Sequence, residues 1–190
     1  MCIIEMSAPR KIITVQKKIT LKIVLVAIFT AIGIVLSFFN PFAYIELFGT
    51  KINPFAHLIN AISGVLLGPF YAVLIATLIA IIRFSYGIGS IYAFPGGIPG
   101  ALIVGIFAYI IAYKKSELRS IGALFEPIGT VIIGGSISSL MSYYMLELDV
   151  TPILIMWGLF AASSIVGSIM GYIILLMLEK GMNITYLNFK

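Results

Sequence analysis

The sequence contains few of the residues that enzymes and metal centres depend on. Of its 190 residues, one is cysteine (Cys2), one is histidine (His57), and only 10% are charged. One cysteine cannot form an internal disulfide, and a structural zinc site commonly takes four ligands. The chain also has no Gly-x-x-x-x-Gly-Lys-Ser/Thr loop for nucleotide phosphates. We therefore expect no metal, no cofactor and no ATP hydrolysis by this chain, and we do not expect an enzyme.

Apolar side chains, in contrast, are in excess. They make up 61% of the chain, and the mean hydropathy is +1.15. Soluble domains are about 45–50% apolar and about 25% charged, so the solvent of this chain must be lipid. At about 20 residues per span, we predict an all-α integral membrane protein, a six-helix bundle. The predicted helices are about 20–39, 54–68, 69–85, 96–113, 121–146 and 152–179, with tails at 1–19 and 181–190 around one membrane domain.

The basic residues predict how the bundle is oriented. Ten of the twelve lie near the termini or between the fourth and fifth predicted helices. Positive charge favours the cytoplasmic side, so both termini are predicted to be cytoplasmic, in the cell membrane. This asymmetry accounts for the net charge of +5 without nucleic acid. The first apolar run is longer than a signal-peptide core and lacks a small-residue cleavage site, so we expect a retained anchor.

Small residues four apart occur on several predicted helices. The sets are Ala27 and Ala31; Ala72, Ala76 and Ala80; Gly97, Ala101 and Gly105; and Ser163, Gly167 and Gly171. Such spacing lets two membrane helices approach closely. We expect most of these sets to pack helices inside the bundle, and a minority to form external docking grooves.

The fifth predicted helix carries a polar stripe at i+4 spacing, comprising Glu126, Thr130, Gly134, Ser138 and Ser142. These residues share one face, which must turn towards the bundle or a cavity because lipid offers no hydrogen-bond partner. We take Ser138 as a candidate ligand contact. Pro127 suits a first helical turn, so we expect Glu126 near the cytoplasmic interface, at the opposite depth from Arg83.

Two polar residues and one cation interrupt the apolar segments of the predicted outer half. His57 and Asn60 are three apart and share a helix face. Ionisable or amide groups at membrane depth usually mark a ligand or ion pathway. Arg83 continues the Ala72-Ala76-Ala80 stripe, so it points inward near the outer edge. It either snorkels to the interface, orders the outer loops, or binds a polar ligand group.

Aromatic residues, including Tyr92 and Trp157, gather on the predicted outer side. Interfacial belts of tyrosine and tryptophan are common, but here the inner side has fewer aromatics. We infer a mostly neutral pocket that opens outward and suits a small heteroaromatic ligand held by stacking and a few hydrogen bonds. Loops 40–53 and 86–95 are expected to enclose it.

Several runs of sequence then resemble one known family, the ThiW group of the S components of energy-coupling factor (ECF) vitamin transporters. These runs are Pro54-Phe55-Ala56-His57-Leu58-Ile59-Asn60, Leu67-Gly68-Pro69-Phe70-Tyr71-Ala72, Arg83, Gly87-Ile88-Gly89-Ser90, Ala93-Phe94-Pro95-Gly96 and Glu126-Pro127-Ile128-Gly129-Thr130. The resemblance extends from the first to the fifth predicted helix. One departure is Ala56, where the group often has glutamine before the histidine.

The resemblance implies a ligand, partners and a mode of action. The ligand is the thiamine precursor hydroxyethylthiazole, and His57, Asn60 and Arg83 match the group's central motif. The partners are an EcfT-like membrane coupling subunit, docked at Ala27 and Ala31, and two cytoplasmic ATPases. An S component captures its ligand from outside, topples in the membrane and releases the ligand inward.

Three alternatives stay open from the sequence. The chain is an S component for another molecule, such as thiamine, hydroxymethylpyrimidine or an unrelated vitamin. A small membrane enzyme would need a cluster of acids or histidines at one depth. A channel or self-associating protein would conduct or assemble without a ligand.

Overall fold

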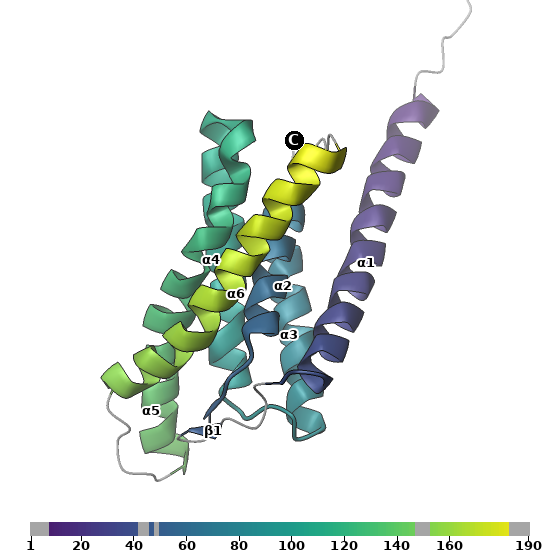
Figure 1. The fold of residues 1–190 in the computed structure, drawn as a ribbon. Coiled ribbons are helices and arrows are strands. Elements are labelled where there is room, and N and C mark those ends of the chain that lie inside the picture. Colours follow the sequence, from purple (N-terminus) through teal and green to yellow (C-terminus); the bar gives the residue numbers. More distant parts are fainter. Residues whose placement is uncertain (1–7, 42–45, 48–49, 147–152, 183–190) are drawn as a thin grey trace, which may run out of the picture.

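The computed structural model describes residues 8–41, 46–47, 50–146 and 153–182, which form a helical bundle with one short hairpin (Figure 1). The α-helices are α1 (Ala8–Phe38), α2 (Pro54–Leu67), α3 (Pro69–Ser85), α4 (Ala93–Lys114), α5 (Gly135–Leu146) and α6 (Ile153–Met182). A 3₁₀ helix, η1 (Ser116–Phe125), and a π-helix, η2 (Ile128–Gly134), precede α5. Strands β1 (Glu46–Leu47) and β2 (Thr50–Lys51) pair antiparallel, with Glu46 opposite Lys51. The predicted helical class is confirmed.

Helix length separates the elements into two groups. Four helical stretches are long and apolar enough to cross a membrane: Ile19–Phe38, Ala93–Lys114, Ser116–Tyr144 and Ile153–Gly181. Helices α2 and α3 have 14 and 17 residues and rise about 21 Å and about 26 Å, less than the roughly 30 Å of a hydrocarbon core. Helix α2 is buried along nearly its whole length, so the longer helices enclose it. The six-span count remains a prediction.

The start of α1 and the end of α6 lie at the same end of the bundle (Figure 1). The hairpin and the connection between α3 and α4 lie at the opposite end. This arrangement is the one expected of an even number of crossings. Which end faces the cytoplasm remains a prediction.

Helix α2 is fixed at both ends by local sequence. At its start, Asn53 Oδ1 accepts a hydrogen bond from the backbone N–H of Ala56 at 3.3 Å, and Pro54 occupies the first helical position. At its end, Gly68 has a φ of 86°, which favours glycine, and Pro69 starts α3 at once. A single residue thus joins α2 and α3, and the predicted tight turn at Gly68-Pro69 is confirmed.

Two predicted helix starts are corrected. Helix α1 begins at Ala8 and not at residue 20, so residues 8–19 of the predicted tail are helical. Helix α4 begins at Ala93 and not at residue 96. In both cases a proline, Pro9 or Pro95, falls in the first turn, where the missing N–H group has no intrahelical partner to lose.

The fifth predicted helix, 121–146, is three segments that start earlier, at Ser116. Glycines explain the irregular course. Gly129 and Gly134 lie directly against the backbone carbonyls of Pro99 and Pro95 in α4, where a Cβ atom would clash. Close backbone contact with α4 replaces regular α-helical geometry over this stretch.

Most of the small-residue sets pack inside the bundle, as expected. Gly105 of α4 contacts the backbone of Pro69, and Gly167 of α6 contacts Pro54 and His57. Ala72, Ala76 and Ala101 form a buried cluster between α3 and α4.

Ala27 and Ala31 are different, because both are exposed. The buried face of α1 consists of Val26, Thr30, Gly33 and Ser37.

The close contact at Gly105 predicts a stability difference between two matched substitutions. Gly105→Ala should lower the free energy of unfolding by about 1–3 kcal/mol, because the added methyl group meets the Pro69 backbone. Gly158→Ala on α6 should be neutral or slightly stabilising, because nothing lies within 4 Å of its Cβ position. Thermal unfolding in detergent measures both, and equal effects would contradict the packing described.

Candidate ligand-binding site

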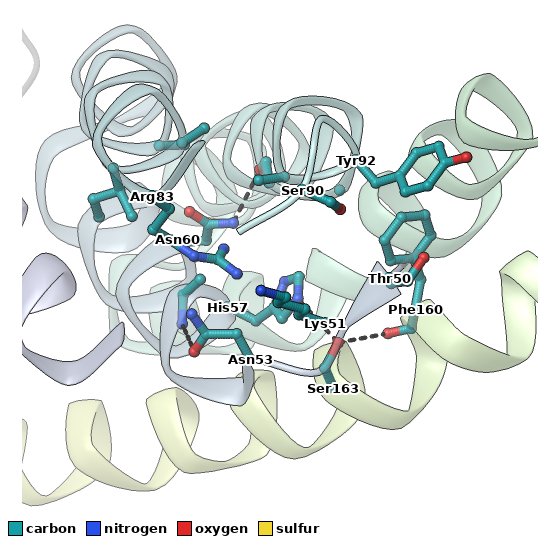
Figure 2. A pocket seen from close by; sticks show the side chains of 17 residues that line it. Thr50, Lys51, Asn53, His57, Asn60, Arg83, Ser90, Tyr92, Phe160 and Ser163 are labelled. Carbon is teal, nitrogen blue, oxygen red and sulfur yellow. Dashed lines mark hydrogen bonds between the residues drawn. The ribbon is translucent and has the colours of Figure 1, made fainter. Parts of the chain in front are cut away.

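A small pocket, here named the polar pocket, lies at the hairpin end of the bundle (Figure 2). Strand β2, the start of α2, the end of α3, the start of α4 and the first half of α6 contribute to it. Its polar lining residues are Thr50, Lys51, Asn53, His57, Asn60, Arg83, Ser90, Tyr92 and Ser163. The remaining lining residues are Ala56, Ala76, Ile79, Ala80, Ala93, Gly96, Gly97 and Phe160. None of these described lining residues is an acid.

The free space in the polar pocket is about 30 Å³, which is room for one or two water molecules. The lining side chains therefore occupy most of the volume between the helices at this place. A ligand the size of a thiazole ring needs some of them to move apart.

Directly behind the polar pocket lies Glu126, whose side chain is fully buried. Its Oε1 atom is 2.8 Å from His57 Nδ1, 2.7 Å from Thr130 Oγ1 and 3.2 Å from Asn60 Nδ2. Its Oε2 atom accepts a hydrogen bond from Ser164 Oγ at 2.6 Å. An ionised carboxylate only accepts hydrogen bonds and has about four lone-pair sites. Each of these four neighbours can supply a donor, so both carboxylate oxygens have hydrogen-bond partners within the fold.

The carboxylate sets the orientation of two pocket-lining side chains. The contact of His57 Nδ1 with Glu126 Oε1 at 2.8 Å turns the Nε2 atom of His57 towards Ser163 Oγ at 3.2 Å. The amide of Asn60 donates to Glu126 and, at 2.9 Å, to the carbonyl oxygen of Gly97. Both groups are therefore held in place before any ligand arrives.

Helix α4 approaches the carboxylate closely because Gly100 has no side chain. A Cβ atom there would clash with Glu126 Oε1 and with Thr130 Oγ1. Thr130 Oγ1 is also 2.8 Å from the carbonyl oxygen of Gly96, so its one proton serves this carbonyl or the carboxylate. Gly100 is therefore required for the packing of α4 on this network.

The predicted depth of Glu126 is wrong. We expected it at the cytoplasmic interface, opposite Arg83 in depth and away from the pocket, but it contacts His57 and Asn60. The reason is η1, which precedes Glu126 and begins five residues before the predicted helix start at residue 121. A 3₁₀ helix advances about 2.0 Å per residue, so its ten residues carry the chain about 20 Å into the bundle. The predicted inward orientation of the stripe is confirmed for Glu126 and Thr130, both fully buried.

Arg83 lies in the last turn of α3 and is 7% exposed. It lines the polar pocket, and Figure 2 shows its guanidinium pointing inward. The backbone N–H of Gly89 donates to the carbonyl oxygen of Arg83 at 3.0 Å. Arg83 Nε is buried without a hydrogen-bond partner. Its burial excludes the snorkelling interpretation and leaves the other two, loop ordering and ligand binding.

The other candidate residues divide into two groups. Tyr92 lines the polar pocket, is 3% exposed, and its hydroxyl lies 2.6 Å from Ser142 Oγ. Ser138 and Trp157 are not among the lining residues. Ser138 donates to the carbonyl oxygen of Gly134 at 2.8 Å, and Trp157 Nε1 donates to Ser136 Oγ at 3.1 Å.

Sequence reasoning missed several lining residues. Ser163, beside Ser164 in an apolar helix, was assigned only to helix packing, although a buried hydroxyl pair in a membrane helix also signals a polar network. Lys51 is one of the two basic residues outside the group of ten that predicts the orientation. Its Nζ atom donates to the carbonyl oxygen of Gly87 at 2.8 Å, linking the hairpin to the α3–α4 connection. These are the two loops expected to enclose the ligand, and residues of both line the polar pocket.

Long apolar helices around a small polar pocket define a helical membrane protein with a cavity at one end of the bundle. Within the described ranges, no three histidine, cysteine, aspartate or glutamate side chains gather as a metal site would require. The chain belongs to the thiamine-precursor transporter protein family (ThiW), whose family model matches residues 23–181. Comparison with curated proteins gives no match, and neither does comparison with solved structures. The family consists of transporters, so the chain is a membrane transport protein.

The buried network predicts that Glu126 is essential for stability. Glu126→Ala should lower the free energy of unfolding by about 3 kcal/mol or more, because several buried donors lose their acceptor. Glu117→Ala, at an exposed position of η1, should change it by less than about 0.5 kcal/mol. Thermal unfolding in detergent compares the two variants. A Glu126→Ala protein as stable as the control would show that the network contributes little.

Proposed function

We propose that this protein is the substrate-binding S component of an ECF-type transporter and takes up the thiamine precursor hydroxyethylthiazole. The family supports transport of a thiamine precursor. The assignment of hydroxyethylthiazole as the ligand is supported mainly by the polar pocket, in which His57 and Asn60 are held in place by Glu126. A site with prearranged hydrogen-bonding groups binds a small ligand with less loss of entropy.

The chemistry of the polar pocket fits a thiazole better than thiamine itself. Thiamine carries a positive charge. The described lining also carries positive charge, on Lys51 and Arg83, and contains no acid. Like charges at close range oppose binding. The rings of Tyr92 and Phe160 offer apolar surface to a heteroaromatic ring. Hydroxymethylpyrimidine remains the alternative precursor.

The proposal includes partners and a location. An EcfT-like membrane coupling subunit docks on the α1 surface at Ala27 and Ala31, whose exposure leaves them accessible. Two cytoplasmic ATPases supply the energy, because the chain has no phosphate-binding loop of its own. The protein lies in the plasma membrane as a six-span bundle with both termini cytoplasmic. The polar pocket, at the end opposite the start of α1, then faces outward for capture.

Ligand binding tests the assignment directly. The purified protein should bind hydroxyethylthiazole in a saturable way in calorimetry. His57→Ala should weaken binding about 10- to 100-fold, as expected for loss of a buried hydrogen-bonding group. Absence of binding to hydroxyethylthiazole, with binding of hydroxymethylpyrimidine instead, would contradict the thiazole assignment.

Ser164→Ala is the matched control for this experiment. Ser164 donates to Glu126 but does not line the polar pocket. The Ser164→Ala substitution therefore perturbs the hydrogen bonds of Glu126 without removing a group that lines the polar pocket. Binding by this variant should stay close to wild type, and an equal loss in both variants would assign His57 to stability alone.

The docking surface generates a separate prediction. Replacement of Ala27 and Ala31 by tryptophan should abolish assembly with the coupling subunit, because bulky rings prevent close helix approach. Ligand binding by the isolated subunit should not change. Val166→Trp, at a position of α6 that is 46% exposed, is the control and should assemble normally. Co-purification and uptake assays measure the outcome, and uptake that survives both tryptophans contradicts the docking site.

A further inference from the structure

Arg83 is a cation whose burial the fold does not explain. Its side chain is 7% exposed, its Nε atom has no hydrogen-bond partner, and it forms no ion pair with any described residue. Buried charges in proteins are normally paired, because an unpaired one is costly. Its guanidinium points into the polar pocket (Figure 2), so the missing partner is expected there.

The acid nearest to the polar pocket is not that partner. Both oxygens of Glu126 are already occupied by hydrogen bonds from α2, η2 and α6. The second cation of the lining, Lys51, donates to the carbonyl oxygen of Gly87 at 2.8 Å and so has a partner within the fold. The positive charge that remains unmatched is therefore centred on Arg83.

The polar pocket has two chemically different sides. In Figure 2, Tyr92 and Phe160 lie on one side, Arg83 and Asn60 on the other, and His57 between the two sides. A ligand that matches this order has an aromatic ring at one end and a hydrogen-bond acceptor at the other. The planar guanidinium fork suits a carboxylate or phosphate, which it can bind through two parallel hydrogen bonds.

We propose that the polar pocket takes an anionic thiazole, bearing a carboxylate or phosphate group that binds the Arg83 guanidinium. This inference rests on the proposed function and refines its substrate class, because the neutral alcohol becomes the weaker ligand. The anion supplies the partner that Arg83 lacks. Ring contacts with Tyr92 and Phe160 distinguish the ligand from a free inorganic anion.

The test compares ligands that differ mainly in charge. Calorimetry on the detergent-purified full chain would use hydroxyethylthiazole, its phosphate ester, 4-methylthiazole-5-carboxylate and inorganic phosphate. At least one anionic thiazole should bind about 10- to 100-fold more tightly than the neutral alcohol, as expected for a charge-assisted bidentate contact. Neutral alcohol binding as tightly as both anions would overturn the proposal.

Substitutions at Arg83 then separate the anion contact from general damage. Arg83→Met should remove the preference for anions, weakening the binding of the anionic thiazoles at least about tenfold more than that of the neutral alcohol. Arg83→Lys should keep part of the preference, since it retains the charge but loses the fork. An equal loss for neutral and anionic ligands in both variants would overturn the proposal.

Stability without ligand provides a second measurement, independent of binding. Arg83→Met should unfold at the same or a higher temperature than wild type, because it removes an unpaired buried charge. Arg119→Met is the matched control, since Arg119 is also buried and its Nε atom is in the same situation as that of Arg83, but Arg119 makes another interaction and lies outside the polar pocket. It should lower the unfolding temperature. Strong destabilisation by Arg83→Met would assign Arg83 to the fold and overturn the proposal.

Failure of the proposed function would be recognised separately. If no thiazole binds, thiazole capture is excluded, and inorganic phosphate decides the anion site. Saturable binding of inorganic phosphate that is lost in Arg83→Met would support an anion site at Arg83. If wild type does not bind phosphate, the proposed anion site is wrong.

Discussion

The carboxylate of Glu126 is completely buried in an apolar bundle, so every hydrogen bond it accepts must come from the protein. The donors come from α2, η2 and α6, and α4 approaches it through Gly100. One side chain thus holds together helices that are far apart in the sequence. Moving any of these helices would leave a buried charge or several buried donors without a partner.

This constraint explains the irregular backbone between α4 and α5. A regular helix starting near residue 121 would place Glu126 close to the membrane interface, where water could solvate it. The 3₁₀ helix η1 instead carries the chain deeper, and the glycines of η2 bring its backbone against α4. The π-helix lies next to the network, as single π-turns often do at functional sites. The backbone departs from regular α-helical geometry where close contact with the Glu126 carboxylate requires a different path.

The sequence was sufficient for the helical class, for the turn at Gly68 and for grouping His57, Asn60, Arg83 and Tyr92 around one pocket. Helical periodicity and the cost of polar groups in lipid determine these features. The depth of Glu126 was not predictable in this way, because periodicity gives the face of a residue but not the rise of an irregular segment. The place of Lys51 in the pocket lining depends on the pairing of β1 with β2. Each strand has only two residues, which is too short to show a hydrophobic pattern in the sequence.

The two buried charges at this end of the bundle have opposite situations, although they lie close to the same pocket. Glu126 accepts hydrogen bonds on both oxygens and does not line the polar pocket, whereas Arg83 lines it, and its Nε atom has no hydrogen-bond partner among the described residues. A charge satisfied within the fold contributes to the fold. A charge left unsatisfied in a binding pocket has its partner outside the chain, and its sign then limits which ligands fit. Glu126 therefore positions His57 and Asn60, and in our proposal Arg83 selects among ligands by charge.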